Sequence, residues 1–97
     1  MASLDILILT QKNCAFCEVA KKLFDQLARE YPLAISTLGL ETRDGQEMAR
    51  QGSVLFSPGI FIDGDAFSYG RPSEGKIRRE IERRFAQRPR QDAKRRD

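Results

Sequence analysis

The two cysteines of the chain, Cys14 and Cys17, lie three positions apart in the stretch TQKNCAFCEVAKKLF at residues 10–24. Cysteines at this spacing can bind a metal ion, form a redox-active dithiol, or pack as two small apolar side chains. A structural zinc ion takes four cysteine or histidine ligands, and the chain has no histidine. A metal or cluster would need carboxylate ligands or a second copy of the chain. The residues therefore favour a redox couple, and we expect no metal site. The alternatives are a metal or cluster bound by two copies of the chain, or an inert pair of cysteines.

The cysteine pair stands between an expected strand and an expected helix. Residues 4–9 form a short apolar run with β-branched members, which is typical of a buried strand. From Cys14 onward, apolar residues recur about every four positions, which predicts a helix that ends near Glu30, before Pro32. The cysteines would therefore lie in the first turn of that helix, directly after a connecting loop.

The first turn of a helix is a favourable place for a thiolate. Its backbone N–H groups have no partners within the helix, and the helix dipole places positive charge there. We therefore expect the pKa of Cys14 to lie below the free value of about 8.5, which would make Cys14 a nucleophile near neutral pH. Cys17, one turn further along and better shielded, would be the resolving thiol.

The rest of the chain predicts three more strands and two more helices. Apolar runs indicate strands at residues 33–38, 59–62 and 66–69, and the turn sequence DGD between the last two is typical of a hairpin. The sequence DGQE at residues 44–47 matches a capping box, which would open a short helix ending at Gly52.

The last helix is indicated by Ile77, Ile81 and Phe85, which recur at intervals of four and form a narrow apolar face. The expected order is β-α-β-α-β-β-α. This is an α/β domain in which a parallel βαβ unit is followed by an antiparallel hairpin and a packing helix. The length of 97 residues allows one domain, which we assign to residues 1–87.

Composition limits the classes of protein to which the chain can belong. Its 40% hydrophobic and 32% charged residues are ordinary for a soluble globular protein. No apolar run reaches the roughly 18 residues of a membrane span, and the N-terminus lacks a signal-peptide pattern. We therefore expect a cytoplasmic protein without membrane contact, in which cysteines are more often catalytic than permanently bridged.

The C-terminal part carries the excess of positive charge. Residues 76–97 contain ten Lys or Arg against four Asp or Glu. Glu80 and Glu82 interrupt the basic residues and no aromatic residues alternate with them, so we do not expect nucleic-acid binding. Residues 88–97 hold one apolar residue and are predicted to form a basic disordered tail, which could dock an acidic protein.

Two neighbours of the cysteines are candidate binding residues. Lys12 could stabilise a thiolate at Cys14, or a substrate carboxylate, through its charge, or it could be merely solvated. Phe16, between the cysteines, could belong to an exposed apolar collar that docks substrates, or it could belong to the core.

The chain resembles the thioredoxin superfamily. The resemblance rests on C-x-x-C at the start of the first helix, a proline at the entrance of the third strand some forty residues later, a hairpin, and Gly-Arg-Pro before a final helix. The short N-terminus is similar to that of the glutaredoxin-sized branch. The resemblance covers residues 4–85 and implies a thioredoxin fold, with a central mixed four-stranded sheet flanked by helices.

The resemblance also implies roles for individual residues. Cys14 matches the exposed nucleophile of the family and Cys17 the resolving cysteine. Pro58 matches the cis-proline that lies beside the cysteine pair, although from the local sequence alone a trans proline would be the commoner form. Ser57 would then offer backbone hydrogen bonds to an extended thiol substrate.

Departures from the family pattern bear on the cofactor. The dipeptide between the cysteines is Ala-Phe, whereas thioredoxins typically have Gly-Pro and glutaredoxins Pro-Tyr. Gln11 stands where glutaredoxins usually carry a lysine. Ser-Tyr-Gly-Arg at residues 68–71 replaces the Gly-Gly and acidic residue with which glutaredoxins hold glutathione. We therefore expect no cofactor, with glutathione as the alternative.

Residues and resemblance together predict an enzyme, a thiol–disulfide oxidoreductase that acts as a monomer through the Cys14–Cys17 couple. Its substrates would be disulfides or thiols of proteins or small molecules, and a reductase or glutathione would supply the electrons. The alternative is a non-catalytic thioredoxin-fold module that docks a protein partner and uses its cysteines, if at all, as a redox sensor.

Overall fold

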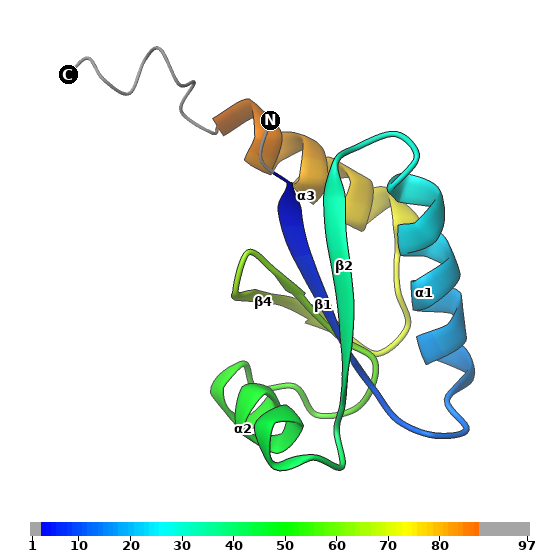
Figure 1. Cartoon of the computed structure of the whole chain (residues 1–97), viewed down its shortest axis with the longest axis vertical. Helices are drawn as coiled ribbons and strands as arrows, with labels where there is room; N and C mark the ends of the chain where they lie inside the picture. Colours follow the sequence, from blue (N-terminus) through cyan, green and yellow to red (C-terminus); the bar gives the residue numbers. More distant parts are fainter. Residues whose placement is uncertain (1–2, 88–97) are drawn as a thin grey trace, which may run out of the picture.

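A four-stranded sheet and three helices make up the computed structural model, which describes residues 3–87 (Figure 1). The elements follow the predicted order. In chain order they are β1 (Leu4–Thr10), α1 (Ala15–Leu27), β2 (Leu33–Gly39), α2 (Arg43–Gln51), β3 (Gly59–Ile62), β4 (Asp65–Tyr69) and α3 (Glu74–Gln87). The tail expected at residues 88–97 lies outside the described residues.

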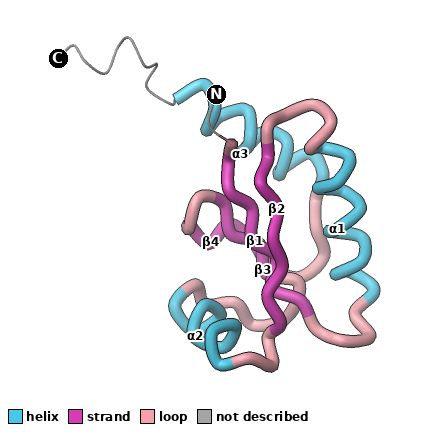
Figure 2. Tube along the Cα trace, viewed as in Figure 1, coloured by secondary structure: helices cyan, strands magenta, loops and turns pink. Residues whose placement is uncertain are grey.

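The sheet is mixed and has the strand order β2-β1-β3-β4 (Figure 2). β1 and β2 run parallel, from Leu4 opposite Leu33 to Thr10 opposite Gly39. β3 is antiparallel to both β1 and β4. A parallel pair needs a crossover connection, which α1 supplies. The prediction of an α/β domain with a mixed four-stranded sheet is therefore confirmed.

The main core lies between the sheet and the two helices α1 and α3. Side chains alternate across a strand, so Ile6 and Ile8 of β1 and Ile60 and Ile62 of β3 share one face of the sheet. The buried residues that cluster with these four are Leu4, Ala20, Leu23, Phe24, Leu27, Ile77 and Ile81. This packing fixes the start of α1 close to the end of β1, where the two cysteines lie.

The capping box predicted at residues 44–47 is wrong. The N-cap of α2 is Thr42, whose hydroxyl accepts a hydrogen bond from the Gly45 N–H at 2.9 Å. A Cβ on Gly45 would lie 2.0 Å from the carbonyl oxygen of Gly39, so α2 approaches the end of β2 too closely at this residue for any side chain larger than that of glycine. Gly52 ends the helix as expected.

Within residues 3–87, every helix is too short or too polar to span a bilayer.

Candidate active site

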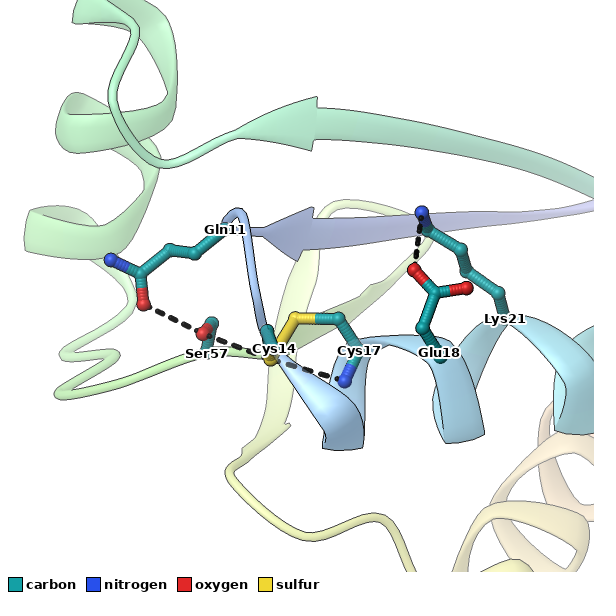
Figure 3. The surroundings of a disulfide bond; sticks show 6 residues. All are labelled: Gln11, Cys14, Cys17, Glu18, Lys21 and Ser57. Atoms are coloured by element: carbon teal, nitrogen blue, oxygen red, sulfur yellow. Dashed lines mark hydrogen bonds and ion pairs between the residues drawn. A yellow bond between two sulfur atoms is a disulfide. The ribbon is translucent and has the colours of Figure 1, made fainter.

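Cys14 and Cys17 form a disulfide at the N-terminus of α1 (Figure 3). Cys14 is the N-cap residue, and its Sγ accepts a hydrogen bond from the Cys17 N–H at 3.1 Å. Cys14 is half-buried, whereas Cys17 is 1% exposed. Cys14 is therefore the more exposed residue of the pair, and the fold covers Cys17.

The segment before β3 brings Ser57 and Pro58 to the disulfide, although Ser57 follows Cys14 by 43 positions. The Ser57–Pro58 peptide bond is cis, and Pro58 is buried. The Ser57 Oγ lies 3.4 Å from the Cys14 Sγ and 2.7 Å from Oε1 of Gln11 (Figure 3). The Pro58 carbonyl accepts a hydrogen bond from the Gly70 N–H at 2.9 Å, which ties this segment to the end of β4.

The loop between β1 and α1 places Gln11 near the site and leaves Lys12 exposed. Of the hydrogen bonds and ion pairs found among residues 3–87, none joins Lys12 to Cys14. The polar groups within hydrogen-bonding distance of the Cys14 sulfur are instead the Cys17 N–H, at 3.1 Å, and the Ser57 hydroxyl, at 3.4 Å. Sequence reasoning gave Gln11 no role, because its contact depends on a residue from a distant loop. Its polar side chain three positions before Cys14 was the available signal.

Exposed apolar residues stand next to the site residues in the sequence of two segments. Phe16, directly before Cys17, is 45% exposed, and Phe56, directly before Ser57, is 56% exposed. The Phe56 ring meets Tyr69 edge to face, with ring centroids 5.0 Å apart. The sequence singled out Phe16 but missed Phe56 and Tyr69, because their contact forms only when β4 pairs with β3. We call Phe16, Phe56 and Tyr69 the apolar collar.

Several arginines of α3 are engaged in ion pairs with neighbouring carboxylates. Glu80 accepts hydrogen bonds at 2.6 Å from both Arg83 and Arg84. Arg84 also bonds the carbonyl of Ile62 and the carboxylate of Asp65, each at 3.1 Å. The hydrogen bonds, first from Arg83 and then from Arg84, lower the pKa of Glu80 to about 2. This network fastens α3 to the turn between β3 and β4.

Replacing Glu80 by glutamine is expected to lower the free energy of unfolding at pH 7 by about 1–2 kcal/mol, since two arginines lose their charged partner. The folded-state pKa of about 2 lies below the ordinary 4.5. The stabilisation is therefore fully present above about 4.5 and is lost as the pH falls towards 2. Urea unfolding at pH 7 and pH 3 measures this, with Glu41→Gln at an exposed site as the control. A difference between wild type and Glu80→Gln that does not shrink at pH 3 would contradict it.

Metal-ligating side chains do not gather in the described part of the chain. Residues 3–87 contain no group of three or more His, Cys, Asp or Glu side chains that could hold a metal ion.

Comparisons with known proteins point to the same kind of chemistry. No family model matches the chain. A protein of Methanocaldococcus jannaschii named thioredoxin is 25% identical over 85 residues, which make up 88% of this chain and the whole of that protein. This homologue, together with the C-x-x-C pair, indicates a thiol–disulfide redox function.

Solved structures share the fold. A mutant thioredoxin from Halobacterium salinarum NRC-1 has a TM-score of 0.65 at 18% identity, over 84% of this chain and 74% of that one. A chain named "Structure of a malarial protein" has a TM-score of 0.64 at 18% identity, over 84% of this chain and 97% of that one. The protein has a thioredoxin fold, and the predicted resemblance to the thioredoxin superfamily is confirmed.

Proposed function

We propose that the protein is a thiol–disulfide oxidoreductase that exchanges electrons with protein disulfides through Cys14 and Cys17. The observation that carries the proposal is the asymmetry of the pair: the half-buried Cys14 is the N-cap of α1, and Cys17 is buried one turn behind it. One sulfur can meet a substrate, and the other can reach only its partner. A metal clip or two inert core residues would not need this arrangement.

In the first step, the Cys14 thiolate attacks one sulfur of a substrate disulfide. A bond forms between the Cys14 Sγ and that sulfur, and the substrate S–S bond breaks. The other substrate sulfur leaves as a thiolate and takes a proton from solvent. The backbone N–H of Cys17, which lies 3.1 Å from the Cys14 Sγ, favours the attacking thiolate because it donates a hydrogen bond to it.

In the second step, Cys17 gives its proton to solvent and its sulfur attacks the Cys14 Sγ. The mixed disulfide breaks, the second substrate thiolate leaves, and the Cys14–Cys17 disulfide remains. The substrate has gained two electrons and the protein has lost two. An external dithiol, or two monothiols such as glutathione, returns the pair to the reduced form. Because the sulfur atoms carry both electrons, the cycle needs no organic cofactor.

The apolar collar favours a protein as the substrate. An exposed apolar patch beside a reactive group is typical of a surface that docks another protein. Phe56 and Tyr69 support each other through their edge-to-face contact, so they present a preformed surface next to Ser57. A small charged disulfide would gain little from these rings, whereas a polypeptide with apolar residues beside its cysteine would bury them.

Replacing Phe56 by serine is expected to raise the KM for a protein disulfide such as insulin by about fivefold to tenfold, since an exposed aromatic anchor is lost. Phe56→Ser should reduce a small-molecule disulfide at the wild-type rate. Phe56→Tyr should reduce both the protein disulfide and the small-molecule disulfide as the wild-type protein does. Steady-state turnover with dithiothreitol as the electron source compares the wild-type protein with the two variants. An equal loss on both substrates would contradict docking at the collar.

The same assay tests the proposed function itself. If the wild-type protein turns over neither substrate, the oxidoreductase proposal fails. The alternative would then be a binding module, which should capture its partner unchanged when both cysteines are replaced by serine.

A further inference from the structure

The hydroxyl of Ser57 lies between two acceptors. Its Oγ is 2.7 Å from the Gln11 Oε1 and 3.4 Å from the Cys14 Sγ (Figure 3). A serine hydroxyl has one proton, so it can donate to only one of the two at a time. In the disulfide form the sulfur of Cys14 is neutral and a weak acceptor, and the shorter contact to the amide oxygen of Gln11 takes the proton.

Reduction changes which acceptor is stronger. A thiolate at Cys14 carries a full negative charge, and a hydrogen bond to a charged acceptor is roughly twice as strong as a neutral one. The Ser57 proton then turns towards the sulfur, and the lone pairs of the Ser57 oxygen turn towards Gln11. Gln11 is exposed, so its side-chain amide is free to rotate and present its NH2 group to the Ser57 oxygen.

We propose that Gln11 and Ser57 are positioning residues whose hydrogen bond reverses direction when Cys14 becomes a thiolate. In the reversed state the Gln11 NH2 donates to the Ser57 Oγ, and the Ser57 hydroxyl donates to the Cys14 Sγ. Hydrogen bonds in such a chain polarise one another, so Gln11 raises the thiolate population without touching the sulfur. This inference rests on the proposed function, because it assigns the pair a part in activating the same nucleophile.

The backbone donor to Cys14 and the charged residues that stand near it in the sequence are separate from this chain of hydrogen bonds. The Cys17 N–H donates to the Cys14 Sγ from within α1 at 3.1 Å. Glu18, in the first turn of α1, is held by Lys21 at 3.4 Å, and Lys12 in the preceding loop is exposed. None of these contacts involves Ser57 or Gln11, so substitutions at the two positions test the relay by itself.

The test is the pH dependence of alkylation of Cys14 in the reduced protein, followed by mass spectrometry. At a fixed pH below the midpoint, Ser57→Ala should lower the thiolate fraction by about fivefold, the value of one hydrogen bond to a charged group at a half-exposed site. Ser57→Thr keeps the hydroxyl and should have the wild-type thiolate fraction. Gln11→Met should lower the thiolate fraction by about twofold when Ser57 is present. The same substitution should leave the thiolate fraction unchanged when Ser57 is replaced by alanine. Ser36→Ala, at an exposed position of β2, is the control.

Two results would overturn the inference. One is a Ser57→Ala protein with an unchanged alkylation profile, and the other is a Gln11→Met effect of equal size with and without the Ser57 hydroxyl. Either result leaves the proposed function standing if wild-type protein reduces insulin. Conversely, a wild-type Cys14 that titrates like free cysteine, in a protein without turnover, removes the proposed function and this inference together. Gln11 is exposed, so its variant should fold normally even if Ser57→Ala does not.

Discussion

Replacing Cys14 by serine is expected to abolish the reduction of a protein disulfide, with a loss of at least about a thousandfold, the scale of losing an essential catalytic group. A serine hydroxyl is not ionised near neutral pH and cannot form the mixed disulfide, so the first step has no nucleophile. Cys17 cannot substitute for it, because only 1% of its surface is exposed. Insulin reduction with dithiothreitol, corrected for the uncatalysed rate, measures the loss.

Ala15→Ser is the matched control for this variant. Ala15 is exposed and is the first residue of α1, so the control introduces the same side chain beside the site and should retain wild-type turnover. A Cys14→Ser protein within tenfold of the wild-type rate would show that Cys14 is not the nucleophile. The asymmetry of burial would then have no catalytic meaning.

Much of the fold could be predicted because its signals are local. The four residues of β3, Gly59–Ile62, are all buried, and a short apolar run bounded by turn residues indicates such a strand. The spacing of Ile77 and Ile81 likewise gave the buried face of α3. The start of α2 was not predicted in this way, because it depends on the capping contact of Thr42 and on the close packing of Gly45 against Gly39 at the end of β2.

The site was harder to predict because its parts come from distant segments. The position of Cys14 at the start of a helix could be predicted from the sequence, because the spacing of apolar residues changes at Cys14 from that of a strand to that of a helix. The placement of Ser57 beside Cys14 followed only from the resemblance to a known family. The contact between Gln11 and Ser57 had no sequence signal beyond a polar side chain, because a hydrogen bond across 46 positions depends on how two loops meet.

Charge patterning in the last helix shows the same limit. The sequence gives an excess of arginine there, which could have indicated an anionic partner. In the structure Arg78 forms a bidentate ion pair with Glu30, with hydrogen bonds of 2.6 and 3.2 Å, and a further ion pair with Glu74. An arginine fork pairs well with one carboxylate in this way, so Arg78 joins the turn that follows α1 to α3. The sequence alone does not show which arginines have such partners.

Replacing Cys17 by serine is expected to convert the enzyme into a covalent trap. Cys14 keeps its place at the N-cap and still attacks the substrate disulfide, but no second sulfur is present to attack the Cys14 Sγ. The mixed disulfide therefore accumulates, and its release depends on an external thiol. With a protein disulfide and no added dithiol, most of the Cys17→Ser protein should appear as a one-to-one adduct in non-reducing mass spectrometry.

The double variant Cys14→Ser with Cys17→Ser is the control and should form no adduct, whereas wild-type protein should form one only transiently. Serine at the buried position keeps nearly the volume of cysteine, so loss of the fold should not mimic the result, and circular dichroism verifies this. If Cys17→Ser turned over as fast as wild type without an adduct, the resolving role of Cys17 would be wrong. Cys14 would then exchange with monothiols alone, and glutathione, rather than the buried sulfur, would complete the cycle.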